Sequence, residues 1–191
     1  MRKMSLMSAA VVITGLVLLM NFYSSAQDKP KREEFQAQAF GEGTQLGQTF
    51  NVTVIIDDYS PPEDRQALIG VFERAGQKGL VNALGKMRAK GHIAITGTLG
   101  YDVSYIQSFP NAGGRKIRLV TNRPIRVGEA WEDGPSMDYN LSVLELNISD
   151  AKNKSAGTLI PACQFTINKD KELDVEAYQN PWRLVDVIDW K

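Results

Sequence analysis

An alternation of hydrophobic and polar side chains that begins at Ile93 leaves this part of the chain little alternative to β-structure. From Ile93 to Tyr105 the odd-numbered positions are hydrophobic or glycine, and the positions between them are mostly small or polar. A repeat of two residues is typical of a strand that buries one face. Because Gly97 and Gly100 fall inside the run, we expect one long strand that bends or bulges partway along.

Seven further segments have the composition and alternation of strands, and short turns separate most of them. They comprise residues 35–40, 49–56, 116–122, 137–148, 159–167, 173–177 and 182–190. Glycine tolerates positive φ, so the glycine-containing residues 41–47 and 111–114 are expected turns. Strands joined by short turns pair antiparallel. The sequence therefore predicts an antiparallel sheet of about eight strands, curled or closed into a barrel.

The segment 137–148 has an irregular pattern, because the apolar residues Val143 and Leu144 are adjacent. A bulge inserts one extra residue into a strand and moves the following side chains to the other face. A bulge at this point would place Leu141 and Val143 on the same face as Leu144 and Leu146. We therefore expect a bulge in this strand.

The apolar repeat lengthens from two residues to that of a helix after Ser60. Ser60 and Glu63 have the spacing of a capping box, with proline at the first helical position. Apolar residues then recur at helical spacing: Ala67, Leu68, Val71, Phe72, Ala75, Leu80, Val81, Leu84 and Met87. Gly76 and Gly79 interrupt them, and the second helix is expected to stop at Gly91. We predict an α+β protein with a helical hairpin inserted after the second strand and packed on the sheet.

The N-terminal residues have the layout of a secretory signal peptide. Arg2 and Lys3 form a basic head, residues 6–20 are almost wholly apolar, and small residues precede a cleavage site after Ala26. An uncleaved anchor is the alternative, because residues 4–20 reach the lower limit of a membrane-spanning length. We expect cleavage of the signal peptide, residues 1–26. The membrane is then crossed only during export, and the protein is secreted or periplasmic.

Residues 27–34 are polar and contain a proline, which indicates a flexible leader before a single β-rich domain, residues 35–191. A domain of this length buries about 70% of its unfolded surface without covalent staples. The chain contains one cysteine and therefore forms no internal disulfide. Cys163 is in phase with Leu159 and Phe165, so we expect a buried core thiol.

The composition excludes several classes of protein. Lys and Arg total 22, as do Asp and Glu, so the whole chain has no net positive charge to attract nucleic acid. One histidine cannot form a zinc site built on two or three imidazoles. That residue, His92, follows the predicted second helix, where the helix dipole favours a cation. The chain also lacks the motifs of serine hydrolases, phosphate-binding loops and dinucleotide-binding folds, and nothing indicates a cofactor.

Carboxylates remain as candidates for general acid–base chemistry. Glu129, Glu132 and Asp138 lie in or just after a glycine-containing loop, beside Trp131. Such a loop could hold a sugar ring, act as acid and base, or bind calcium, whereas the plainer interpretation is a solvated acidic loop. A carboxylate-dependent hydrolase that uses residues 129–138 is therefore one hypothesis.

Basic residues gather on the second predicted helix, at Lys78, Lys86, Arg88 and Lys90, with no acidic residue between Gly76 and Gly91. They form either a surface for anionic lipid headgroups or a solvated face whose late cations suit the helix dipole. The solvated face is the simpler interpretation.

A second group of residues indicates a pocket for a small ligand. Arg118 falls on the face of its strand opposite the apolar residues, and Tyr101, Tyr105 and Tyr139 lie on the apolar phases of other strands. If the sheet curls, these side chains, with Trp131 from the acidic loop, would line a pocket for an apolar or anionic molecule. Core tyrosines with satisfied hydroxyl groups are the plainer alternative.

Three segments carry a resemblance to known sequences: residues 121–125 (Thr-Asn-Arg-Pro-Ile), 138–146 (Asp-Tyr to Val-Leu-Glu-Leu) and 181–187 (Pro-Trp-Arg-Leu-Val-Asp-Val). Through them the chain resembles a family of uncharacterised exported bacterial proteins, over most of residues 48–188. The resemblance implies a periplasmic or secreted setting and assigns no site residue.

These observations leave three hypotheses. The first is an exported, non-catalytic β-domain that binds a small molecule or a cell-envelope protein. The second is the carboxylate-dependent hydrolase. The third is a structural module whose sheet edge pairs with another protein, which an edge left uncovered by residues 182–190 would favour.

Overall fold

The structure, a computed structural model, describes residues 32–127, 138–151, 154–167 and 173–190. Its elements are β1 (Glu33–Phe40), the short 3₁₀ helix η1 (Gly43–Gln45), β2 (Thr49–Ile56), α1 (Pro62–Lys86), β3 (Gly91–Ile95), β4 (Tyr101–Asn111), β5 (Gly114–Thr121), β6 (Leu141–Ser149), β7 (Ala156–Ile167), β8 (Leu173–Ala177) and β9 (Trp182–Trp190). β1 begins at Glu33, so residues 33–34, which the sequence assigned to the leader, belong to the first strand.

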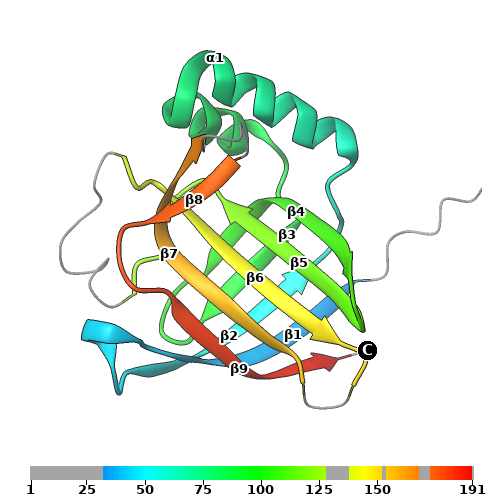
Figure 1. Cartoon of the computed structure of the whole chain (residues 1–191), viewed down its shortest axis with the longest axis vertical. Helices are drawn as coiled ribbons and strands as arrows, with labels where there is room; N and C mark the ends of the chain where they lie inside the picture. Colours follow the sequence, from blue (N-terminus) through cyan, green and yellow to red (C-terminus); the bar gives the residue numbers. More distant parts are fainter. Residues whose placement is uncertain (1–31, 128–137, 152–153, 168–172, 191) are drawn as a thin grey trace, which may run out of the picture.

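The sheet closes on itself. Its strands follow the order β6-β5-β4-β3-β2-β1-β9-β7, and pairing of β6 with β7 completes a barrel (Figure 1). Every strand pair in the described part of the chain is antiparallel. The predicted α+β class is confirmed, with a mainly antiparallel, barrel-like sheet and helical structure after the second strand.

The last two strands share one edge of β7. Residues 163–167 of β7 pair with β8, whereas residues 157–159 pair with β9. β9 also pairs with β1 from Trp190 to Arg183, so the end of the chain joins the first strand to β7. The barrel is therefore closed by its final strand, and β8 extends the sheet beyond the barrel (Figure 1).

Hydrophobic side chains from all around the barrel fill its interior. Phe35, Val54, Ile93, Leu119 and Leu144 are among those that are almost completely buried. An eight-stranded barrel is just wide enough for such side chains to fill it. The inner face of the sheet thus forms the core, and we look for a binding site on the outer face.

The run that begins at Ile93 forms two strands instead of the predicted single one. β3 ends at Ile95, the chain turns, and β4 begins at Tyr101 and pairs antiparallel with β3. Gly97 and Gly100 have φ values of 85° and 77°, which glycine adopts far more readily than other residues. The two glycines therefore reverse the chain where the sequence pattern predicted a bend.

A β-bulge in β4 separates Tyr101 from Tyr105, although the alternation predicted that they share a face. The pairing with β5 shifts by one residue between Val103 and Tyr105. Because side chains alternate with a period of two, one extra residue moves all later side chains to the opposite face. Tyr101 and Val103 therefore pack in the barrel, and Tyr105 packs on its outer face.

β6 lacks the predicted bulge at Val143 and Leu144, because it pairs with β5 without a break. Leu144 and Leu146 pack inside the barrel, whereas Leu141 and Val143 pack outside it, in a cluster that includes residues of α1. The strand is buried on both faces, so the adjacent residues Val143 and Leu144 are both apolar without a bulge between them. A register shift does occur between β6 and β7, and its extra residue lies on β7.

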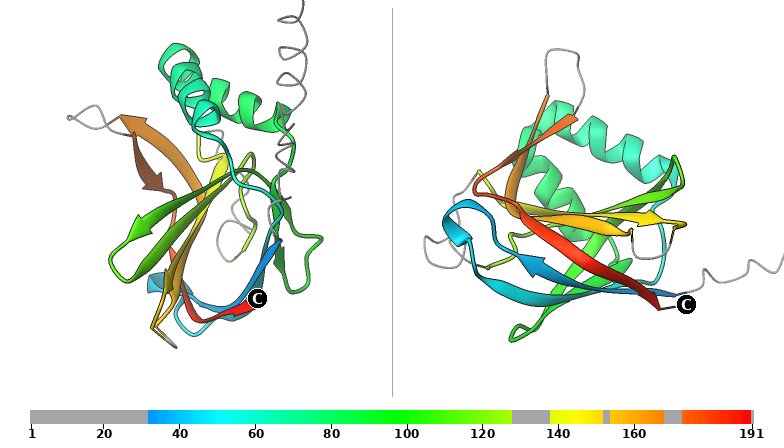
Figure 2. Two further views of the ribbon diagram at one scale, coloured as in Figure 1. Left: turned by 90° about the vertical axis from the view of Figure 1, so that its right-hand side faces the viewer. Right: turned by 60° about the horizontal axis from the view of Figure 1, so that its bottom comes forward.

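α1 is divided by Gly76, whose φ of 59° and ψ of −158° break the helical backbone. Its two arms, residues 62–75 and 77–86, lie against one side of the barrel (Figures 1 and 2). The second arm ends at Lys86 and not near Gly91, which is the first residue of β3. Within the described residues, no helix combines the length and the apolar character needed to cross a bilayer.

The predicted capping box at the start of α1 does not form. Pro61 is the N-cap residue, and no side chain caps the helix. The Ser60 hydroxyl instead accepts a hydrogen bond from the Ile106 N–H at 3.1 Å, and the Ser60 N–H donates to the Ile106 carbonyl at 2.7 Å. Ser60 thus pairs with β4 and holds the start of α1 beside the barrel.

Candidate ligand-binding site

The two arms of α1 pack on the barrel unevenly. Leu80 and Leu84 in the second arm are buried in a cluster with outward-facing residues of β4–β7. Leu68, Ile69 and Phe72 in the first arm are only half-buried. Close packing along one arm and incomplete packing along the other leave a groove between the helix and the sheet, which we call the α1 groove.

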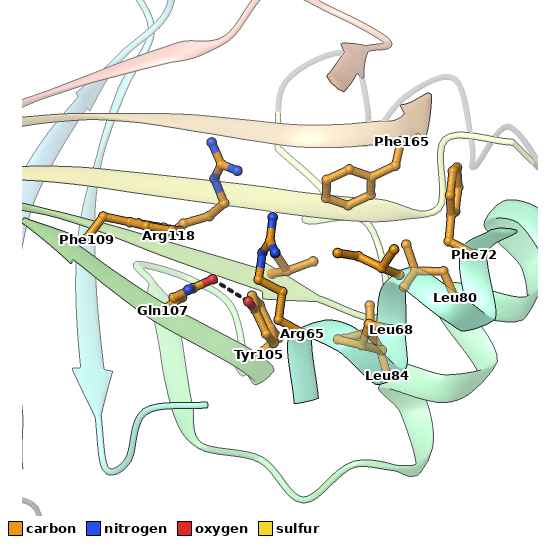
Figure 3. Close-up of a pocket in the computed structure, with 12 residues that line it drawn as sticks. Arg65, Leu68, Phe72, Leu80, Leu84, Tyr105, Gln107, Phe109, Arg118 and Phe165 are labelled. Carbon is orange, nitrogen blue, oxygen red and sulfur yellow. Dashed lines mark hydrogen bonds between the residues drawn. The ribbon is translucent and has the colours of Figure 1, made fainter. Parts of the chain in front are cut away.

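The α1 groove has a volume of about 430 Å³, within the range typical of small-molecule sites. Its lining consists of Arg65, Leu68, Ile69, Phe72, Leu80 and Leu84 from α1, and Tyr105, Gln107, Phe109, Arg118, Val120 and Phe165 from the strands. Figure 3 shows that its two ends differ. Phe72, Leu80 and Phe165 gather at one end, and the polar residues Gln107 and Arg118 lie at the other, beside Phe109.

Gln77, the residue after the break in α1, fastens the helix to β7. Its side-chain carbonyl accepts a hydrogen bond from the Phe165 N–H at 3.0 Å, and its amide nitrogen donates to Asn140 Oδ1 at 2.9 Å and to the Cys163 carbonyl at 3.5 Å. Residues 164–167 of β7 lie beyond the pairing with β6. The glutamine therefore satisfies the Phe165 N–H, which lies beyond the pairing with β6, and it holds Phe165 at the apolar end of the groove.

Tyr105 and Gln107 form part of the polar end. The Tyr105 hydroxyl donates a hydrogen bond to Gln107 Oε1. Burial raises the pKa of Tyr105, although the positive charges of Arg65 and Arg118 oppose the rise. The hydroxyl is therefore protonated at neutral pH. Because its hydrogen occupies Gln107 Oε1, the Gln107 amide nitrogen is the group that can donate to a ligand.

Arg118 reaches the groove from β5 and shares the carboxylate of Glu145 on β6 with Lys116. Glu145 Oε1 accepts a hydrogen bond from Arg118 Nε at 2.7 Å, and Glu145 Oε2 lies 3.3 Å from Lys116 Nζ. Partial burial raises the pKa of Glu145, but the hydrogen bonds and charges of Arg118 and Lys116 outweigh burial and hold the pKa below its ordinary value. Glu145 is thus ionised at neutral pH.

Arg65 differs from Arg118, because within the described residues it forms no ion pair or hydrogen bond. It lies in the first arm of α1, is exposed, and extends beside Tyr105 between the two ends of the groove (Figure 3). None of the described residues that line the groove is acidic. Arg65 therefore adds a positive charge between the two ends of the groove, without an acidic partner among the described residues.

The structure brings together two of the five residues predicted to bind a ligand. Tyr105 and Arg118 both line the α1 groove. They meet on the outer face of the barrel and not in the expected pocket inside the curled sheet, because core side chains occupy that space. Trp131 lies outside the described residues.

Tyr101 and Tyr139 lie away from the groove. Tyr101 is buried in the barrel core, and its hydroxyl accepts a hydrogen bond from the Arg126 N–H at 3.1 Å. The Tyr139 hydroxyl donates to Glu176 on β8 at 2.8 Å. Tyr101 thus matches the alternative interpretation of a core tyrosine with a satisfied hydroxyl group.

The helical side of the groove could not be recognised from the sequence. The spacing of Leu68 and Phe72 predicted a helix face packed on the sheet. Apolar residues have this same spacing whether the helix packs closely on the sheet or leaves a groove beside it. Nothing in the sequence marks Arg65 as a binding residue, because an arginine in the first turns of a helix is common. Gln107 follows a bulge that the sequence alternation does not reveal.

The acidic residues proposed for hydrolysis are not assembled in the described structure. Glu129 and Glu132 lie outside the described residues, and Asp138 is exposed. The described residues contain no group of three or more His, Cys, Asp or Glu that could hold a metal ion. The hydrolase hypothesis therefore gains no support from the geometry.

His92 and Cys163 occupy structural positions. His92 lies on β3 and not at the helix end, with Nδ1 3.1 Å from Asp102 Oδ1 and Nε2 facing Gly100. Cys163 is completely buried, as predicted, and desolvation raises the pKa of its thiol to about 12. A thiol with this pKa is protonated and unreactive at neutral pH.

The predicted basic surface is partly neutralised. Arg88 and Lys90 follow the end of α1 at Lys86, so they are not part of the helix. Lys90 pairs with Asp64 at 3.5 Å, and Arg88 pairs with Asp58 at 3.9 Å. These pairs leave less positive charge for an anionic lipid surface and favour the solvated interpretation.

The edge required by the structural-module hypothesis is not left open at the end of the chain, because β9 pairs with both β1 and β7. β8 pairs with β7 and with no other strand of the described structure. Its exposed side chains include Asp174 and Glu176, and charges on an edge strand discourage further pairing.

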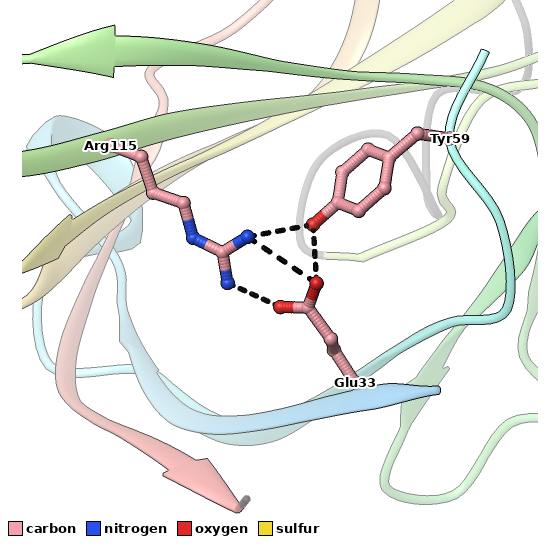
Figure 4. Close-up of polar contacts among 3 residues, drawn as sticks. All are labelled: Glu33, Tyr59 and Arg115. Carbon is pink, nitrogen blue, oxygen red and sulfur yellow. Dashed lines mark hydrogen bonds and ion pairs between the residues drawn. The ribbon is translucent and has the colours of Figure 1, made fainter. Parts of the chain in front are cut away.

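A second polar cluster ties together strands that are not neighbours. The Tyr59 hydroxyl donates to Glu33 Oε1 at 3.0 Å and accepts from Arg115 Nη1 at 3.2 Å, and Arg115 forms an ion pair with Glu33 (Figure 4). Burial and the charge of Glu33 raise the pKa of Tyr59 far above its ordinary value. The three groups satisfy one another, so we assign them a structural role in joining β1 to β5.

No known protein family, curated protein or solved structure matches this chain. A functional assignment therefore has to come from the geometry of the α1 groove.

Proposed function

We propose that this chain is an exported, non-catalytic binding protein that holds a small, largely apolar ligand in the α1 groove. The observation that carries the proposal is the open space of about 430 Å³ across which Leu68, Ile69 and Phe72 face Val120 and Phe165. Covering apolar surface of this kind contributes about 25 cal/mol per Å². A concave, mostly apolar site with a few polar groups is the usual form of a small-molecule site.

Export is the second part of the proposal. It is supported by the basic head, apolar run and small residues of residues 1–26. A secreted or periplasmic location follows from this part of the proposal.

Filling the groove tests the proposal. Ile69→Trp places a large ring in the groove, so it should weaken binding of the neutral apolar dye N-phenyl-1-naphthylamine by about tenfold or more, measured by fluorescence titration of the purified protein. Ile188→Trp is the matched control, because Ile188 is half-exposed on β9 and does not line the groove. It should bind the dye like the unmodified protein.

Thermal unfolding of both variants shows whether the barrel remains folded. If the unmodified protein does not bind the dye, or if folded Ile69→Trp binds it unchanged, the proposal is wrong.

A further inference from the structure

The polar end of the α1 groove offers donors and a positive charge to whatever enters it. Gln107 Oε1 is occupied by the Tyr105 hydroxyl, which leaves the Gln107 amide nitrogen as a donor. Arg65 has five N–H donors and no ion pair or hydrogen bond with any other part of the described structure. A group that accepts hydrogen bonds fits these donors.

The charge balance of the groove points to an anion. Arg118 is already paired with Glu145, which does not itself line the groove. Glu145 is also shared with Lys116, so both arginines that line the groove add positive charge, and Arg65 is the one with no ion pair in the described structure. An anion placed there gains a charge-assisted hydrogen bond, which is stronger than a bond between neutral groups.

The apolar end lies apart from these donors. Phe72, Leu80 and Phe165 gather beyond Arg65, on the side away from Gln107 (Figure 3). A ligand that satisfies both ends has an apolar tail and a head that accepts hydrogen bonds. We propose that the α1 groove binds a single-chain amphiphile with an anionic head, such as a carboxylate, and that Arg65 selects the head. This inference rests on the proposed function and adds the chemical class of the ligand.

Three probes with chains of ten carbon atoms and different heads test the inference: decanoate, decan-1-ol and decyltrimethylammonium. Each is titrated against the purified protein with bound N-phenyl-1-naphthylamine, and displacement of the dye is measured. Decanoate should displace the dye at a concentration about tenfold lower than decan-1-ol, and decyltrimethylammonium should be the weakest.

Arg65→Gln should lower the affinity for decanoate about tenfold. It should change the affinity for decan-1-ol by no more than about twofold. Arg74→Gln is the matched control. It removes an exposed arginine from the same arm of α1, but Arg74 does not line the groove. This variant should keep the preference for decanoate.

The outcomes separate the inference from the proposed function. If the dye does not bind, the proposed function fails and the inference fails with it. If the dye binds but decanoate and decan-1-ol displace it equally, or if Arg65→Gln keeps the preference, only the inference is overturned. The inference would also be overturned if the protein sedimented with phosphatidylglycerol vesicles and decanoate did not displace the dye. The anion recognised would then be a membrane surface.

Discussion

Glu145 shows at the scale of one residue how the outer face of the barrel is held together. It lies directly opposite Arg118 in the pairing of β5 with β6. Opposite charges in this position stabilise a sheet. The same carboxylate offsets one of the two positive charges of Arg118 and Lys116 beside the α1 groove, so it affects both the stability of the sheet and the charge of the site.

Replacing this carboxylate should change the pH dependence of stability. The folded-state pKa of Glu145 lies below its ordinary value, so its contribution is present above the unfolded pKa and is lost as the pH falls through the folded pKa. Glu145→Gln should lower the free energy of unfolding by about 1–2 kcal/mol at pH 7. The difference from the unmodified protein should shrink below about pH 4.

Urea unfolding at a series of pH values measures this effect. Glu73→Gln removes the same charge from an exposed position on α1, so it controls for the change in net charge. A constant difference between Glu145→Gln and the unmodified protein across the series would contradict the assignment of the ion pair.

The site depends on a residue-scale feature that the sequence does not display. The bulge between Val103 and Tyr105 places Tyr105 and Gln107 in the groove and leaves Tyr101 in the core. A bulge is stabilised by the pairing of two strands, and a period of two in one strand contains no information about its partner. The sequence therefore identified Tyr105 and Arg118 but grouped them with the wrong neighbours.

At the scale of elements, the break in α1 sets the shape of the groove. Gly76 adopts φ 59° and ψ −158°, a region that is essentially restricted to glycine. A Cβ atom added to Gly76 meets no other atom within 4 Å. The free-energy cost of a side chain there therefore comes from the backbone conformation and not from clashes with neighbouring atoms. We expect Gly76→Ala to lower the free energy of unfolding by about 1–3 kcal/mol in a urea titration.

Gly70→Ala is the matched control in the same helix. Gly70 lies in the regular first arm, and its added Cβ would approach only the flexible end of Arg74, at 3.3 Å. Alanine is the better helix former, so this variant should be as stable as the unmodified protein or more stable, by up to about 1 kcal/mol. Equal stability of Gly76→Ala and Gly70→Ala would show that the break in α1 is not required.

Element positions followed from periodicity better than element ends did. The hydrophobic alternation located the strands, and helical spacing located both arms of α1. The turn at Gly97 and Gly100 and the use of Ser60 by β4 were not foreseen. Both depend on pairing with a segment elsewhere in the chain, which outweighs the local signals of a strand or a helix cap.

At the scale of the whole molecule, the barrel depends on its last strand. Trp182 begins β9 opposite Leu159 of β7, is 1% exposed, and packs on Phe50 with the ring centroids 4.6 Å apart. This contact lies where the end of the chain meets strands from its beginning and its middle. The seam therefore joins the segments that are most distant in sequence.

Removing the ring at this seam should destabilise the whole barrel. Trp182→Ala is expected to lower the free energy of unfolding by about 3–5 kcal/mol, because it leaves a cavity in the core. Trp190→Ala, at the other end of the same strand, removes a ring that is 55% exposed and should cost less than about 1 kcal/mol. Urea unfolding followed by circular dichroism measures both, and similar losses would contradict the role of the seam.

The sequence by itself determined where most of the strands lie along the chain, the place of the helix, the antiparallel class and the burial of Cys163. Each of these follows from local periodicity, composition or the length of connections, which a chain carries along its sequence. The tertiary structure decided which face of each strand is inside, where the barrel closes, and that the first arm of α1 stands off the sheet. These depend on strand register and helix packing between distant segments. The α1 groove exists only because of them.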